Sequence, residues 1–94
     1  MPARKKAPEK GPGPVEVLRD GFLKATIWKN EGENGTYFST TLAKTYEKDG
    51  QPHDGHSFTG ADLLRISELA RQAYARIRKY RAELPREEAE PTQP

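Results

Sequence analysis

The chain of 94 residues contains no cysteine, which removes several kinds of chemistry at once. Without cysteine there is no disulfide framework, no thiolate zinc site and no cysteine nucleophile, so packing alone must hold the ordered part together. Apolar residues are also scarce, since 33% of the chain is hydrophobic and 32% is charged. So little apolar surface predicts one small domain and leaves part of the chain as tail.

Long hydrophobic runs are a second absence. No stretch approaches the ~20 apolar residues of a membrane span, and the basic N-terminus leads into proline and glycine instead of the apolar region of a secretory signal. We therefore expect a soluble, cytoplasmic protein with no membrane partner. The net charge of +2 does not by itself indicate nucleic acid.

The two ends of the chain differ in composition from the middle. Residues 1–14 hold four of the eight prolines and four basic side chains against one acidic side chain, whereas residues 85–94 are acidic. Neither end offers the apolar side chains that would offset the entropy of ordering. We predict a disordered basic Pro/Gly tail over residues 1–14, a single domain over residues 15–84 and a disordered acidic tail over residues 85–94.

Alternating apolar and polar residues predict a sheet in the first part of this domain. Residues 15–19 are β-prone and precede the hairpin signal Asp20-Gly21. Residues 22–30 alternate with period 2, and residues 36–48 do the same beyond a glycine-rich turn. The core face of this sheet is predicted to carry Leu23, Ala25, Ile27, Phe38 and Leu42.

Thr59 and Asp62 mark the start of a long helix. A hydroxyl at the N-cap and a carboxylate three residues later satisfy the free N–H groups of the first turn, and Pro85 ends the helix because it has no N–H to donate. Apolar residues recur between these points at spacings of three and four. This stripe consists of Leu63, Ile66, Ala70, Ala73, Ile77, Tyr80 and Leu84, widened by Leu69 and Tyr74. With a brief fourth strand at residues 56–58, the prediction is an α+β fold, a four-stranded antiparallel sheet (β-β-β-β-α) with one long C-terminal helix packed on one face.

Trp28 is the sharpest candidate for function. Its parity places it opposite the core residues of its strand, on the face of Lys24, and Tyr37 is expected near it across the hairpin. Exposed aromatic rings beside lysines on a sheet are used to stack single-stranded bases while the cations meet phosphates. The alternative is that a tail, a dimer partner or a bulge covers the ring, because tryptophan is usually largely buried.

The C-terminal half of the helix is strongly basic. This half is either a patch that binds phosphate or a solvated face that serves solubility and the helix dipole. The segment His53-Asp54-Gly55-His56 brings two imidazoles and a carboxylate together, but it lies in a Pro/Gly turn and lacks a rigid third or fourth ligand. No hydrolase, P-loop or dinucleotide-binding pattern occurs, so we expect no metal, no cofactor and no enzymatic activity.

Three short motifs stand out along the predicted core: K-A-x-I-W-x-N-E at residues 24–31, Thr41-Leu42, and Ser57-Phe58 followed by Asp62-Leu63-Leu64. Over residues 18–78 they resemble a family of small uncharacterised bacterial proteins, which brings no established activity. At a coarser level, four strands and a terminal helix are similar to the single-stranded-DNA-binding fold of the positive-cofactor transcriptional coactivators and the Whirly proteins. This resemblance in topology implies a sheet that faces the DNA and helices that help to join subunits.

These observations predict a small module that binds single-stranded or distorted DNA with low sequence selectivity. The expected contact residues are Lys24, Trp28, Tyr37, Lys44, Arg71, Arg76 and Lys79. The competing hypothesis is a protein-interaction module in which the same aromatic face meets a protein partner. We expect no small-molecule substrate, and we predict a homodimer in which Tyr80 and Leu84 reach past a short sheet towards the second subunit.

Overall fold

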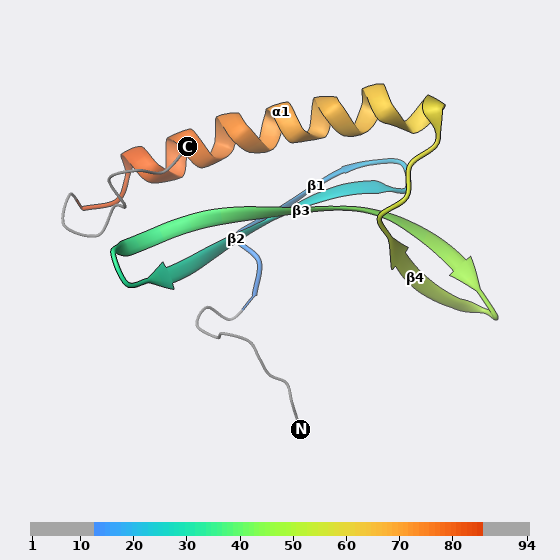
Figure 1. Cartoon of the computed structure of the whole chain (residues 1–94), viewed down its shortest axis with the longest axis horizontal. Helices are drawn as coiled ribbons and strands as arrows, with labels where there is room; N and C mark the ends of the chain where they lie inside the picture. The colour runs from blue at the N-terminus through green and yellow to red at the C-terminus, as the bar shows by residue number, and fades with distance from the viewer. Residues whose placement is uncertain (1–12, 86–94) are drawn as a thin grey trace.

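The computed structural model describes residues 13–85 and confirms the predicted α+β class. Four antiparallel strands form one sheet in the order β1-β2-β3-β4, and a single helix follows and lies along one face (Figure 1). The elements are β1 (Glu16–Asp20), β2 (Leu23–Gly32), β3 (Gly35–Lys48), β4 (Gln51–Gly55) and α1 (Gly60–Ala82). Apart from residues 13, 14 and 85, the predicted tails lie outside the described residues.

Tight turns set the register of the whole sheet. Asp20 pairs with Leu23, so the first turn consists of Gly21 and Phe22, with Gly21 at a φ of +63°. Glycine at the first central position with positive φ is typical of the type II′ turn, whose twist suits a hairpin. The turn between β2 and β3 is equally short, because Gly32 pairs with Gly35.

The fourth strand lies earlier than predicted, over residues 51–55 instead of 56–58. Asp49 and Gly50 both have positive φ, so they form a two-residue turn that starts β4 immediately. Pro52 lies inside this strand and pairs with Glu47 at the outer edge of the sheet. An edge position tolerates proline because the missing N–H would point away from the sheet.

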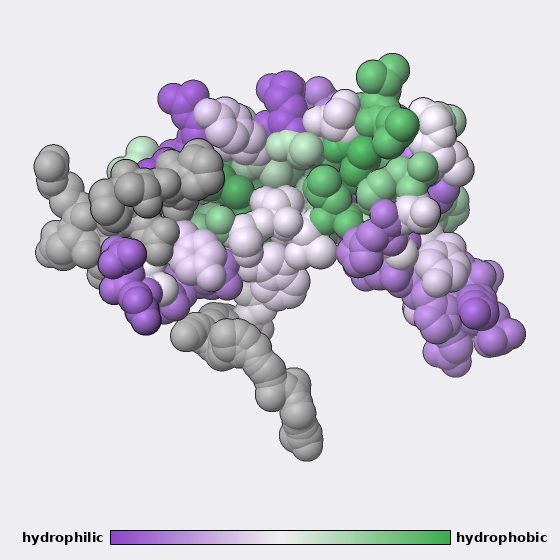
Figure 2. All heavy atoms as spheres, viewed as in Figure 1, coloured by the Kyte–Doolittle hydropathy of each residue, from purple (hydrophilic) through white to green (hydrophobic). Residues whose placement is uncertain are grey.

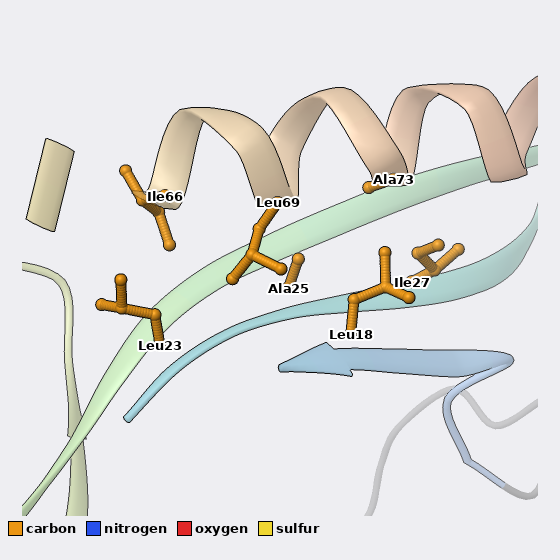
Figure 3. Packing of buried hydrophobic residues seen from close by; sticks show 7 residues of the cluster. All are labelled: Leu18, Leu23, Ala25, Ile27, Ile66, Leu69 and Ala73. Atoms are coloured by element: carbon orange, nitrogen blue, oxygen red, sulfur yellow. The ribbon is translucent and has the colours of Figure 1, made fainter. Parts of the chain in front are cut away.

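The core lies between α1 and the face of the sheet predicted to bear it. Seven buried residues, contributed by β1, β2 and α1, interdigitate there (Figure 3): Leu18, Leu23, Ala25, Ile27, Ile66, Leu69 and Ala73. Phe38 and Leu42 of β3 are partly buried against this cluster, so the predicted core face is confirmed. Only three of the seven come from the helix, which leaves the core small.

The start of α1 is the predicted capping box. The Asp62 N–H donates to the Thr59 hydroxyl (3.3 Å), and the Asp62 carboxylate accepts from the Thr59 N–H (3.0 Å). Lys44 of β3 donates to the same carboxylate at 2.7 Å. These hydrogen bonds lower the pKa of Asp62 to about 2, the Lys44 bond being the strongest cause. The helix is therefore capped and joined to the sheet at one place.

Two residues of the predicted helix stripe are exposed. Leu63 is 54% exposed and Tyr74 is 57% exposed, because α1 lies mainly over β2 and leaves its flank towards β3 uncovered. The opposite flank is bound to β1 by ion pairs. Arg65 donates to Asp20 at 2.8 Å, and Arg76 donates to Glu16 at 2.6 Å.

The C-terminal end of the helix also packs on its own sheet. The Tyr80 ring stacks on Phe38 with centroids 5.7 Å apart, and its hydroxyl donates to Glu16. That hydrogen bond, followed by burial, raises the pKa of Tyr80. The prediction that Tyr80 reaches past a short sheet is therefore wrong, since β2 and β3 are long enough to meet it.

Candidate binding face of the sheet

The structure places Lys24, Trp28 and Tyr37 on the sheet face opposite α1, as their parity predicted. Trp28 pairs with Ser39, and Tyr37 pairs with Asn30, so the two aromatic rings occupy diagonal positions on neighbouring strands. The described residues supply no second layer over this face, because α1 packs on the other one. Both aromatic side chains are 37% exposed.

Trp28 is held in place by a hydrogen bond across the hairpin. Its Nε1–H donates to the Thr41 hydroxyl at 2.9 Å. Beside it, the Asn30 amide donates to the Ser39 hydroxyl at 3.0 Å. One ring face of Trp28 can therefore remain available while the polar edge of the indole is already satisfied. The arrangement is an aromatic platform set among short polar side chains.

Lys24 is engaged by an acidic partner. Its ammonium lies 2.9 Å from the Asp54 carboxylate, which also accepts a hydrogen bond from the Thr45 hydroxyl at 2.9 Å. The hydrogen bond from Lys24, followed by that from Thr45, lowers the pKa of Asp54. A phosphate at this position would have to compete with Asp54 for the Lys24 ammonium.

Arg19 is a cation on this face that the sequence analysis missed. It pairs with Lys24 in the register of β1 and β2, so the two side chains point to the same side, and Arg19 is exposed. Among residues 13–85 it forms no ion pair. A turn at Asp20-Gly21, as the sequence indicated, would have placed Val17 opposite Lys24; the pairing of Arg19 with Lys24 follows only from the turn at Gly21 and Phe22.

Lys44 does not belong to this face. It pairs with Leu23, a core residue, and its ammonium is bound to Asp62 beside the helix. Even-numbered residues of β3 point towards α1, so the strand alternation itself excludes Lys44 from the face of Trp28. Lys44, predicted as a contact residue, therefore lies on the opposite side of the sheet from Trp28.

The three helix residues of the predicted site also lie on the other side of the sheet. Arg71 is paired with Glu68 at 2.8 Å within the helix, and Arg76 is paired with Glu16 of β1. Lys79 lies exposed on α1. One flat surface cannot bring these side chains together with Trp28, because the sheet separates them (Figure 1).

The two histidines of the β4 segment have separate surroundings. The His53 ring stacks on Tyr46, and His56 Nδ1 lies 2.6 Å from the carbonyl oxygen of Leu42. Residues 13–85 hold no group of three or more His, Cys, Asp or Glu side chains placed to bind a metal ion. The acidic Glu31 points away from the aromatic platform, since it pairs with Thr36 on the helix side and accepts its hydroxyl hydrogen bond.

Comparison with known proteins found no matching family model, curated protein or solved structure. The candidate face therefore rests on its own geometry. Within the described part of the chain, α1 is too polar to cross a bilayer.

Proposed function

We propose that the chain is a nucleic-acid-binding module without enzymatic activity, which holds single-stranded or distorted DNA on the sheet face opposite α1. The observation that carries this proposal is the pair of half-exposed rings, Trp28 and Tyr37, on a face that no described element covers. Aromatic rings on a sheet stack with bases of any sequence, because every base has a π-face. Binding by stacking is therefore expected to have low sequence selectivity.

The cations of this face support a moderate electrostatic contribution. Arg19 and Lys24 lie side by side on β1 and β2, about 13 Å along the strand from Trp28 at ~3.3 Å per residue. The Lys24–Asp54 pair is partly exposed, so a phosphate can displace the carboxylate. With few cations on the face, few counterions are released and the salt dependence is shallow.

The test uses Trp28 as its own reporter, since it is the only tryptophan in the chain. Titration with single-stranded oligonucleotide should quench its fluorescence, and duplex of the same sequence should quench it less. The logarithm of the binding constant should fall with the logarithm of salt concentration by about 0.7 for each phosphate contacted.

Trp28→Ala is the decisive variant. It should weaken binding of the oligonucleotide by about 1–3 kcal/mol, the contribution of one stacked base. Tyr46→Ala is the matched control, because Tyr46 is an exposed aromatic residue on the other face of the sheet. Both variants should remain folded; a loss of roughly 3–5 kcal/mol of stability in Trp28→Ala would show that the indole belongs to the core.

A protein partner is the second candidate for the same face. Two contacts favour a protein partner. The hydrogen bond to Thr41 fixes the Trp28 indole, and a preorganised tryptophan is a frequent interface hot spot. Lys24 is already paired with Asp54 and is therefore less available to a phosphate. The salt slope separates the two candidates, because each phosphate contact adds about 0.7 to the slope of log K against log salt, whereas an aromatic protein interface gives a slope near zero. Failure of every oligonucleotide to quench Trp28 would leave the protein partner as the better explanation.

A further inference from the structure

The outer edge of β3 is open over most of its length. On one side β2 pairs with residues 35–44, whereas on the other side β4 pairs only with residues 44–48. In Figure 1, β4 lies beside only one end of the long β3. Within residues 13–85, no strand pairs with the outer edge of residues 36–43.

Even-numbered residues direct their backbone groups to this edge. The Thr45 N–H donates to the Phe22 carbonyl at 2.8 Å, so the odd-numbered residues of β3 point towards β2. His56 Nδ1 lies 2.6 Å from the Leu42 carbonyl oxygen, which confirms the outward direction of the even-numbered residues and shows that this carbonyl is already occupied. The N–H and C=O groups of Phe38 and Thr40 therefore face outwards, ready to pair with another strand.

This edge lacks the features by which proteins protect exposed strands. Residues 36–43 read T-Y-F-S-T-T-L-A, which contains no charged residue, no proline and no glycine. Such an edge is long, β-prone and uncharged, and edges of this kind pair with other chains. The opposite edge of the sheet is the short β1, which is bound to the helix by two ion pairs.

An apolar groove runs along the open edge. It has a volume of about 220 Å³ and is lined by Thr40 and Leu42 of β3 and by Ala70, Ala73, Tyr74 and Ile77 of α1. The exposed Leu63 lies on the same flank of the helix, seven residues before Ala70. In Figure 2, hydrophobic atoms follow the junction between the helix and the sheet. Side chains of an added strand would enter this groove on alternate residues.

We propose that the edge of residues 36–43 binds the same edge of a second copy of this chain. The two β3 strands pair antiparallel about a two-fold axis perpendicular to the sheet, which creates one sheet of eight strands. Both helices then lie on the same face, separated by roughly 14 Å, three strand spacings of ~4.8 Å. Tyr74 and Leu63 of each copy fill the space between them.

Length and charge favour a second copy as the occupant. The open edge is bounded at one end by β4 and at the other by the turn after Gly32, so two copies offer each other segments of equal length. No like charges meet, because residues 36–43 are uncharged.

The chain's own C-terminal segment is a poorer candidate for this edge. Residues 86–94 contain three glutamates and two prolines, residue types with low strand propensity. A dimer would also compensate for the small core, because it buries apolar surface that a domain of this size leaves exposed. The proposed interface is independent of the nucleic-acid face, although it would set the Trp28 platforms of both copies side by side.

Sedimentation equilibrium of the full chain, without nucleic acid, tests the proposal. A dimer is expected, together with slow hydrogen exchange at the outward amides of Phe38 and Thr40. A monomer at every concentration would overturn it. Slow exchange of these two amides in a monomer would also overturn it, because the edge would then be covered by the chain itself.

Two variants locate the interface. Thr40→Pro removes an outward N–H, and Tyr74→Glu places a carboxylate in the groove; each should raise the dissociation constant of the dimer by about tenfold or more. Ala75→Glu is the control, since it adds the same charge one residue away on the exposed side of α1. Circular dichroism should show that each variant keeps its fold. A dimer that persists unchanged in Tyr74→Glu, with the fold intact, would place the interface elsewhere.

Discussion

Gly21 is required both by the backbone conformation of its turn and by the space that the neighbouring Arg65 side chain occupies. Its φ of +63° is in the left-handed region, and a Cβ at this position would lie 2.6 Å from the Arg65 guanidinium. Gly21→Ala should therefore cost about 1–2 kcal/mol for the backbone alone. A further loss is expected because Arg65 must move away from Asp20. Chemical denaturation measures the sum.

Gly50 supplies the control for this prediction. Its φ is +75°, but a Cβ there would meet nothing within 4 Å. Gly50→Ala should show the backbone cost without displacement of a neighbour. Equal losses in the two variants would mean that Arg65 adjusts without cost.

Asp62 should make the stability of the protein depend on pH. Its pKa is lowered from 3.8 to about 2 in the folded chain by Lys44 and the Thr59 N–H. A lowered carboxyl pKa stabilises the fold above the unfolded value, and this stabilisation is lost as the pH falls through the folded value. Thermal midpoints should therefore decline as the pH falls from about 4 to about 2, and Asp62→Asn should flatten that decline.

Glu68 provides the comparison for the Asp62 prediction. Its pKa is also lowered to about 2, by hydrogen bonds from Arg71 and then Gln72 on the surface of the helix. Because this cluster is half-exposed, salt should weaken its contribution more than that of the buried Asp62. If Glu68→Gln flattened the decline of the thermal midpoint and Asp62→Asn did not, the pH dependence could not be assigned to Asp62.

At the scale of the elements, α1 is held to the sheet differently at its two ends. The N-terminal end is joined through the Lys44–Asp62 pair, and the C-terminal end through Tyr80, Phe38 and Glu16. The flank towards β1 is bound by charged pairs, whereas the flank towards β3 is apolar and open. This asymmetry leaves one side of the helix available for a partner.

The Tyr80 hydroxyl should contribute measurably to this docking. Tyr80→Phe keeps the stacking on Phe38 but removes the hydrogen bond to the Glu16 carboxylate. A loss of about 1 kcal/mol in urea denaturation is expected. Tyr74→Phe, at an exposed position of the same helix, should change stability little. Similar effects in both variants would argue against a specific bond at Tyr80.

At the scale of the whole molecule, stability depends on a few large buried side chains. Three of the eight buried hydrophobic residues are alanines, and Ile27 is one of the few large ones that are fully buried. Ile27→Ala should cost about 2–5 kcal/mol, a large part of the stability of a small domain. Leu64→Ala, on a side chain that is 81% exposed, should cost almost nothing. A mild effect at Ile27 would mean that the sheet can close the cavity.

Local sequence patterns were enough to predict the two central strands, their faces and the helix, but not the bounds of the fourth strand. Period-2 alternation over residues 22–30 and 36–48 placed Ile27 in the core and Trp28 opposite it, because successive side chains of a strand point to opposite sides. The cap formed by Thr59 and Asp62 marked the start of the helix for an equally local reason. The same alternation places Lys44 on the side of the sheet that faces the helix, although it was included among the predicted contact residues because of its charge.

Which surfaces remain open depends on long-range packing that no local pattern reports. The bounds of β4 depend on the turn at Asp49-Gly50 and on an edge position that tolerates Pro52, and among residues 13–85 they leave residues 36–43 without a paired strand on one side. The placement of α1 over β2 buries Ala73 but exposes Leu63 and Tyr74 of the same stripe. Local patterns report which side chains share a face, whereas the cover that each face receives depends on contacts between residues far apart in the chain.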